Sequence, residues 1–207
     1  MPQIVAFGQP KGGVGKSTLA VHFAVIRARE GARVLLVDAD ANFTAARWVH
    51  DGEWEASMDN LTVAASEADH LATLREREDF DLIVIDLPGV RGETFTELVK
   101  PGAVDLLVTP SRCSVQDIEV LPEVLSEVQV PTLTVLTLVS PHGMKKADEW
   151  RDHLTRDGWT IARTTVRQYA AWQDARAVAR LVIDRPTHPN AKADALGVVG
   201  DIKEALK

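Results

Sequence analysis

Cysteine is almost absent from this sequence, because Cys113 is the single one among 207 residues. One thiol forms no internal disulfide, and it provides too few ligands for a thiolate zinc site or an iron–sulfur cluster. Such a sequence suits a reducing compartment, so we expect a cytoplasmic protein. At its own position we expect Cys113 to behave as a small, partly buried hydrophobic side chain.

The sequence also lacks a long apolar run. Its apolar stretches are short, whereas a helix that spans a bilayer needs roughly 20 consecutive apolar residues. The opening Met1-Pro2-Gln3 carries no basic side chain and leads straight into an apolar stretch, unlike a secretory signal. We therefore expect neither a membrane-spanning segment nor export.

A surplus of positive charge is missing as well, because 23 Lys and Arg residues stand against 30 Asp and Glu residues, a net charge of −7. A molecule with that overall field repels nucleic acids and anionic membranes unless its basic residues are gathered locally. Any contact with nucleic acid is therefore expected to use a patch of the surface.

Short apolar runs alternate with stretches of helical character along the chain, a pattern typical of a parallel sheet covered by helices on both faces. The expected strands span residues 4–7, 33–37, 82–85, 106–108 and 133–139, with weaker candidates at 61–64 and 160–164. The expected helices span residues 16–30, 115–128, 145–156 and 191–207. Gly31 and Gly158 are expected to end two helices in the left-handed conformation. The sequence thus predicts an α/β fold in one domain, residues 1–207, with a twisted, mainly parallel sheet of roughly seven strands.

A glycine-rich segment, Lys11-Gly12-Gly13-Val14-Gly15-Lys16-Ser17-Thr18, joins the first expected strand to the first expected helix. Its glycines let backbone N–H groups approach phosphate oxygens closely, at the positive end of the helix dipole. Lys16 is expected to reach the β- and γ-phosphates, and the Ser17 hydroxyl is expected to bind Mg²⁺. Spacing and context together predict a P-loop NTPase-like three-layer sandwich that binds a nucleoside triphosphate with magnesium.

Carboxylates follow two of the expected strands. Asp38 and Asp40 come at the end of the second strand, and Asp86 ends a later one. Because the carboxyl ends of parallel strands meet at one edge of a sheet, these side chains are expected beside the glycine-rich loop. A single aspartate at a strand end is often a turn former, but three beside a phosphate loop indicate a site that manages magnesium and water.

The loop departs from the general phosphate-loop pattern, because Pro10 replaces the first glycine and Lys11 adds a second cation. The variant K-G-G-x-G-K-[ST] marks the deviant Walker A ATPases, and the chain resembles the short, ParF-type members of the ParA partition family over essentially its whole length. Further matching segments are Asp38-Ala39-Asp40, residues 80–86 and Thr109-Pro110-Ser111. The chain departs from these relatives at Ala41-Asn42, where they commonly read Pro-Gln, and at Arg112-Cys113.

The resemblance implies catalytic roles for three residues and ATP as the nucleotide. Lys11 matches the signature lysine that crosses to the nucleotide of a partner subunit, and Lys16 binds the phosphates of its own subunit. Asp40 resembles the carboxylate that orients the attacking water. Asp86 resembles the aspartate that holds Mg²⁺, usually through water, and Asp38 lies nearby for contacts with metal-bound water.

The resemblance also implies a cycle of assembly. ATP binding produces a homodimer, the dimer binds DNA without sequence preference and without a membrane, and a ParB-like partner stimulates hydrolysis that releases it. Such a protein segregates or positions plasmid or chromosomal DNA, or another large cargo, and associates with the nucleoid.

The last third of the chain carries the candidates for contact with DNA and with the nucleotide base. The candidate DNA contacts are Arg163, Arg167, Arg176 and Arg180, with Lys203 and Lys207 as weaker additions. Pro186 begins a proline-rich turn, which forms either a plain loop between two helices or a contact with the base.

Two other functions stay open. A MinD-like membrane-associated regulator needs a terminal helix with basic residues on one side and bulky apolar residues on the other. Residues 198–207 instead contain acidic residues and no aromatic residue. A small-molecule phosphotransferase built on the same loop is the second alternative, and a phosphorylated acceptor would identify it.

Overall fold

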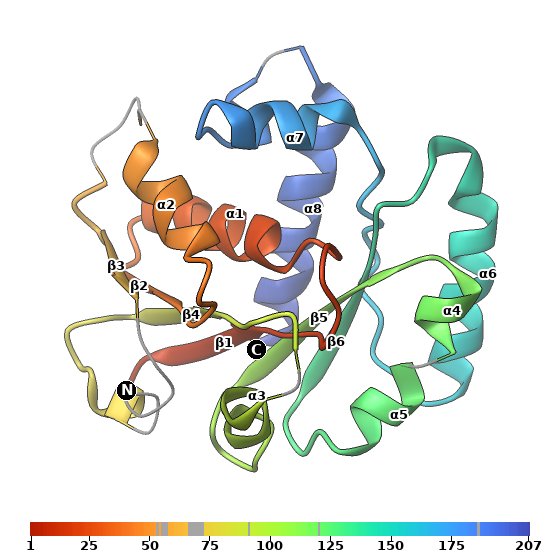
Figure 1. The fold of residues 1–207 in the computed structure, drawn as a ribbon, viewed down its shortest axis with the longest axis horizontal. Helices are drawn as coiled ribbons and strands as arrows, with labels where there is room; N and C mark the ends of the chain where they lie inside the picture. Colours follow the sequence, from red (N-terminus) through yellow and green to blue (C-terminus); the bar gives the residue numbers. More distant parts are fainter. Residues whose placement is uncertain (53, 55–57, 66–72, 91, 120, 186) are drawn as a thin grey trace.

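The computed structural model describes residues 1–52, 54, 58–65, 73–90, 92–119, 121–185 and 187–207. In these residues a sheet of six strands, all parallel, has the order β3-β2-β4-β1-β5-β6 (Figure 1). The strands are β1 (Gln3–Phe7), β2 (Val34–Asp38), β3 (Leu61–Ala65), β4 (Leu82–Asp86), β5 (Leu106–Arg112) and β6 (Thr132–Thr137). The predicted α/β fold with a parallel sheet is confirmed.

The expected strand at 160–164 is wrong. Ile161 makes only an isolated bridge to Thr134 of β6. The N–H groups of Ala162 and Val166 still donate to carbonyls of β6, each at 2.8 Å. The N–H groups of Thr164 and Arg167 donate instead to Asp201 and Asp194 of the last helix, at 2.7 Å and 2.9 Å. The stretch therefore pairs with β6 at isolated points, and a seventh strand does not form in the described residues.

Helices cover both faces of the sheet, as predicted. They are α1 (Lys16–Arg29), α2 (Thr44–Asp51), α3 (Glu93–Leu98), α4 (Val115–Ile118), α5 (Leu121–Ser126), α6 (Met144–Arg156), α7 (Ala170–Ala177) and α8 (Pro189–Ala205), with short 3-10 turns η2 (Pro141–Gly143) and η3 (Val182–Asp184). The single helix expected at 115–128 is wrong, because α4 and α5 share that range. Gly31 and Gly158 have φ angles of 97° and 91°, which confirms the two left-handed helix ends.

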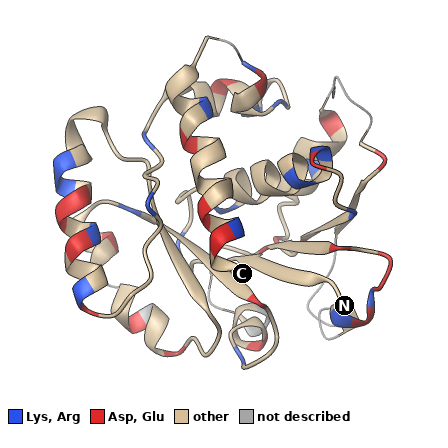
Figure 2. Ribbon diagram, turned by 180° about the vertical axis from the view of Figure 1, so that it is seen from behind, with Lys and Arg blue, Asp and Glu red and all other residues tan. Residues whose placement is uncertain are grey.

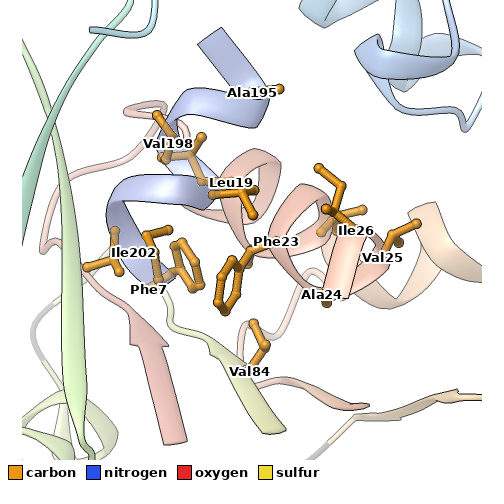
Figure 3. Packing of buried hydrophobic residues seen from close by; sticks show 14 of the residues in the cluster. Phe7, Leu19, Phe23, Ala24, Val25, Ile26, Val84, Ala195, Val198 and Ile202 are labelled. Carbon is orange, nitrogen blue, oxygen red and sulfur yellow. The ribbon is translucent and has the colours of Figure 1, made fainter. Parts of the chain in front are cut away.

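The core lies in two layers because side chains of each strand alternate between the faces. Phe7 points to the face covered by α1, α2, α7 and α8, and its ring centroid lies 5.9 Å from that of Phe23 (Figure 3). Ile4 and Ala6 point to the opposite face, which α3 covers. A third cluster joins α4, α5 and α6 to β6, and Cys113 packs against it partly buried, as expected.

His22 of α1 links the phosphate-loop helix to three other elements from inside the core. Its Nδ1 lies 2.8 Å from the Thr18 carbonyl oxygen, and its Nε2 accepts the Val182 N–H of η3 at 3.1 Å. Its ring also contacts Trp48 of α2 and Trp172 of α7, with centroids 5.7 Å and 5.1 Å away. Burial lowers the pKa of His22 to about 4, so the neutral imidazole with a proton on Nδ1 fits these bonds.

This histidine predicts an acid-sensitive fold. Because the pKa of His22 is about 4 in the folded chain and 6.5 without burial, the unfolded chain binds the extra proton between these values. The contribution of His22 to the free energy of unfolding should therefore be greatest above pH 6.5 and fall by about 3 kcal/mol by pH 4. Chemical denaturation across this range should show that the stability difference between the wild type and His22→Gln shrinks by this amount as the pH falls.

The exposed His50 offers a matched control, because His50→Gln should leave the pH slope of the wild type unchanged. Parallel slopes for the wild type and His22→Gln would show that the buried imidazole does not govern acid sensitivity.

Candidate nucleotide site

The glycine-rich loop leaves β1 at Phe7 and enters α1 at Lys16. Gly13 and Gly15 have φ angles of 70° and 101°, conformations that residues with a side chain rarely adopt. The loop lines a cleft of about 1030 Å³ at the carboxyl edge of the sheet. Every predicted phosphate-binding residue except Lys11 lines this cleft, namely Gly12, Gly13, Val14, Gly15, Lys16, Ser17 and Thr18.

Two further contacts hold the loop in this shape. The Thr137 hydroxyl at the end of β6 donates a hydrogen bond of 2.8 Å to the Val14 carbonyl oxygen. Gly89, after β4, packs so close that a Cβ atom there would lie 3.3 Å from the Gly12 Cα and from the Lys16 Nζ. The loop is therefore braced from both sides before any ligand arrives.

Lys16 is a buried cation inside the curl of the loop. Its side chain is 7% exposed, and its Nζ donates a hydrogen bond of 2.9 Å to the Lys11 carbonyl oxygen. Burial lowers the pKa of Lys16, while Asp86 and Asp40 act in the opposite direction. A phosphate oxygen bound in this cleft would face an ammonium group whose charge is only weakly screened by water.

Asp38 and Asp86 lie opposite each other, paired in register at the ends of β2 and β4, and both are fully buried. Asp38 accepts the Asp40 N–H at 3.1 Å and the Ala46 N–H of α2 at 2.9 Å, and burial raises its pKa. This register brings the two strand-end carboxylates together, and Phe7, the last residue of β1, is paired with Asp86 on its other side.

The two Asp86 carboxylate oxygens accept no hydrogen bond of normal geometry from the described residues. Burial raises the pKa of Asp86 to about 7, although the nearby Ser17 hydroxyl lowers it in part. In the described part of the chain, no group of three or more His, Cys, Asp or Glu side chains is placed so that the protein alone could hold a metal ion. One orphaned carboxylate beside a hydroxyl fits Mg²⁺, which keeps several waters and takes its other ligands from phosphates.

Asp40 stands on the loop between β2 and α2 and lines the cleft. Its Oδ1 accepts hydrogen bonds of 2.9 Å from both the backbone N–H and the side-chain amide of Asn42. Phe43, with a φ angle of 49°, is the N-cap residue that precedes α2. The carboxylate is thus held in place while one oxygen remains for a water molecule.

Lys11 turns to α4 and forms an ion pair with Asp117. The Lys11 side chain is 42% exposed and that of Asp117 is 6% exposed. Burial acts to raise the pKa of Asp117, but hydrogen bonds from Lys11 and Ser114 outweigh it and leave the pKa low. Sequence reasoning missed Asp117, although Ser114-x-x-Asp117 is a capping-box pattern at a helix start and was available as a signal.

The four predicted DNA-contacting arginines divide into two pairs. Arg163 lies against α8, 3.2 Å from Asp201, and Arg167 reaches Asp194 of the same helix at 2.5 Å. Arg176 lines the nucleotide cleft, and together with Arg180 it also lines a second hollow of about 880 Å³ beside α2. Acidic and basic residues interleave along α6 and α8 (Figure 2). Of the weaker candidates, Lys203 is paired with Glu30 at 2.9 Å. Pro186, the candidate for contact with the nucleotide base, lies outside the described residues.

Comparison with known proteins agrees with this geometry. Residues 5–199 match the sequence profile of the CobQ/CobB/MinD/ParA nucleotide binding domain. The chain is 33% identical over 180 residues to the Maintenance of carboxysome distribution protein A of Gloeobacter kilaueensis, which covers 84% of this chain and 81% of that protein.

Two solved structures share the fold at low sequence identity. Apo McdA from Cyanothece has a TM-score of 0.76 at 17% identity, covering 100% of both chains. A Borrelia burgdorferi B31 plasmid partition protein bound to AMPPNP has a TM-score of 0.75 at 16% identity, covering 97% of this chain and 99% of that one.

The buried carboxylate at the end of β4 predicts a conflict between stability and ion binding. Because the pKa of Asp86 is about 7 in the folded chain and 3.8 without burial, the folded chain retains the proton between these values. Without metal, the contribution of Asp86 to the free energy of unfolding should therefore fall as pH rises through this window, by on the order of 4 kcal/mol. Asp86→Asn should be the more stable protein at pH 8 without Mg²⁺, and thermal unfolding measures this.

The same variant should lose the stabilisation that Mg²⁺ with nucleotide gives the wild type. Asp152→Asn, an exposed change on α6, serves as the control and should behave as the wild type in both tests. An Asp86→Asn chain no more stable than wild type at pH 8 would contradict the burial argument.

Proposed function

Because this chain belongs to the CobQ/CobB/MinD/ParA nucleotide-binding family, whose ParA and MinD members are P-loop ATPases, we propose that it is an ATPase that positions or segregates a large cargo. ATP binding makes it a dimer, and hydrolysis stimulated by a partner returns it to monomers. The observation that carries the proposal is a buried Lys16 inside a glycine loop, beside the paired carboxylates Asp38 and Asp86.

The chain's own residues divide the work of hydrolysis. Loop N–H groups and Lys16 bind the phosphates, and Ser17 would hold Mg²⁺ together with Asp86 and Asp38, which act through water. Magnesium, when bound, supplies positive charge that neutralises the β- and γ-phosphate oxygens. Asp40, fixed by Asn42, orients the attacking water in line with the γ-phosphorus.

Lys11 couples turnover to assembly. In the single chain its ammonium group is paired with Asp117 of α4. In the proposed dimer it leaves that carboxylate and neutralises charge on the nucleotide of the partner subunit. ATP binding energy then becomes dimerisation energy, and cleavage of the γ-phosphate removes it.

The names of two similar proteins support a proposal about the cargo and the partners. The 33%-identical relative is named for the maintenance of carboxysome distribution, and a structural neighbour is named as a plasmid partition protein. We propose a plasmid, chromosomal or other large cargo, a ParB-like stimulating protein, and nucleoid association through non-specific DNA binding. No described helix is both long and apolar enough to cross a membrane.

Nucleotide should control the oligomeric state. Sedimentation of the wild type should give a dimer with ATP or a slowly hydrolysed analogue, and a monomer with ADP. Lys16→Ala should stay monomeric and lose nucleotide affinity, because its loss leaves phosphate charge uncompensated. Asp40→Ala should bind ATP normally and accumulate as a dimer, because hydrolysis slows by on the order of 100-fold while binding is retained.

Arg156→Ala is the control, since this exposed arginine bonds only a carbonyl of its own helix. Normal ATP affinity in Lys16→Ala would refute the phosphate assignment. A phosphorylated small-molecule acceptor in the product mixture would point to a transferase instead.

DNA binding should rely on the pair of arginines beside the cleft rather than on the pair against α8. Arg163 and Arg167 are already paired with acidic residues. Arg176 and Arg180 line the hollow beside α2, and Arg176 also lines the nucleotide cleft. Because of this position, replacing both by Ala should weaken ATP-dependent binding to random-sequence duplex more than replacing Arg163 and Arg167. The slope of log affinity against log salt should also fall by about one for each DNA phosphate that the variant no longer neutralises.

Fluorescence anisotropy at several salt concentrations measures both quantities, with Arg156→Ala as the control. Equal losses in the two double variants would reject this division of the four arginines.

A further inference from the structure

Arg112 ends β5 and lies directly against the glycine-rich loop. Its guanidinium donates a hydrogen bond of 2.8 Å to the Gly13 carbonyl oxygen. The fit is close, because a Cβ atom on Gly13 would lie 3.0 Å from the same guanidinium nitrogen. Arg112 is exposed and lines the same cleft as the loop. A fixed cation therefore stands on the wall of the nucleotide cleft.

The cleft has a phosphate end, and Arg112 lies at it. Gly89 packs against both Gly12 and the Lys16 Nζ. The last phosphate of a triphosphate would lie beside this lysine. Gly13, the residue that Arg112 contacts, is the next residue of the loop. Leu138, after β6, and Val166 also line the cleft.

In the part of the chain that the structure describes, no hydrogen bond or ion pair joins Arg112 to a carboxylate. Within the described residues its hydrogen bond goes to a neutral carbonyl, while the neighbouring Asp117 is bonded to Lys11 and Ser114. Arg112 does lie near enough to Asp117 to lower its pKa. A guanidinium has five N–H donors in a planar fork that matches phosphate oxygens. One donor anchors the group, and the others are available to a ligand.

We propose that Arg112 is a catalytic residue that contacts the terminal phosphate bound in its own subunit. The inference rests on the proposed ATPase function and adds to it a second cation beside Lys16. The general phosphate-loop pattern does not specify an arginine at this place. Unlike Lys11, it needs no partner subunit to reach the site.

In the hydrolysis step, a water oxygen bonds to the γ-phosphorus while the bond from that phosphorus to the β–γ bridging oxygen breaks. The electron pair of the broken bond stays on ADP. One proton of the water remains on inorganic phosphate and the other passes to solvent. Negative charge grows on the transferring phosphoryl oxygens and the bridging oxygen, and a guanidinium held at Gly13 stabilises that charge more than it stabilises bound ATP.

Two variants separate this role from simple bracing of the loop. Arg112→Gln retains an N–H donor for the Gly13 carbonyl oxygen but has no charge. Arg112→Lys retains the charge but loses the planar fork. Steady-state ATP turnover should fall on the order of 100-fold in kcat for Arg112→Gln, with KM changed far less, and Arg112→Lys should recover part of the loss.

A binding measurement gives an independent readout. Calorimetry with Mg²⁺–ADP should give equal affinities for the wild type and Arg112→Gln. With Mg²⁺–ADP and aluminium fluoride, which mimics the phosphoryl group in transfer, the variant should bind at least about tenfold more weakly. Arg156→Ala, with its exposed arginine on α6, should match the wild type throughout.

The outcomes decide between the claims. If Arg112→Gln turns over ATP as the wild type does and binds both probes equally well, Arg112 is not catalytic although the ATPase function stands. If Arg112→Gln weakens ADP and the fluoride complex alike while kcat is kept, the residue only braces the loop. A wild type that binds ADP without hydrolysing ATP would refute the proposed ATPase, while the fluoride comparison would still decide on Arg112. A wild type that binds no nucleotide would overturn both proposals.

Discussion

The burial of opposite charges around one loop is the constraint on which the rest of this molecule depends. Lys16 and the carboxylates Asp38 and Asp86 are removed from water at the edge of a sheet whose interior is apolar. Burial disfavours the charged form of each group, since it lowers the pKa of Lys16 and raises the pKa of Asp86 to about 7. A bound phosphate and a divalent ion would relieve these costs together, in agreement with the proposed function.

The surrounding fold keeps that arrangement in place. Gly89 and Thr137 press on the loop from β4 and β6, and His22 connects the helix behind it to α2, α7 and η3. These supports come from elements far apart in the sequence. A preorganised loop loses little conformational freedom when it binds phosphate. Its affinity for phosphate is therefore higher than that of a flexible loop.

Sequence reasoning recovered most of the fold and the centre of the site, for physical reasons. Buried parallel strands read as apolar runs, and the loop spacing fixes where a phosphate meets a helix start. The partner of Lys11 and the contact of Arg112 with Gly13 were missed, because each joins residues about a hundred positions apart. The region 160–164 was assigned as a strand because its composition allows one. The Thr164 N–H bonds instead to Asp201 of α8, a contact with a distant residue that local sequence does not reveal. The roles assigned to the arginines near the C-terminus stay predictions.

Asp38 has a second consequence through its bond to α2. One of its oxygens accepts the Ala46 N–H, so the first turn of that helix is tied to the carboxylate expected near the metal. Ala46 directly precedes Arg47, which lines the hollow shared with Arg176 and Arg180. If a bound ion drew this oxygen away from the Ala46 N–H, the start of α2 would lose one of its ties to the sheet. The position of Arg47 in the hollow would then depend on whether the cleft is loaded.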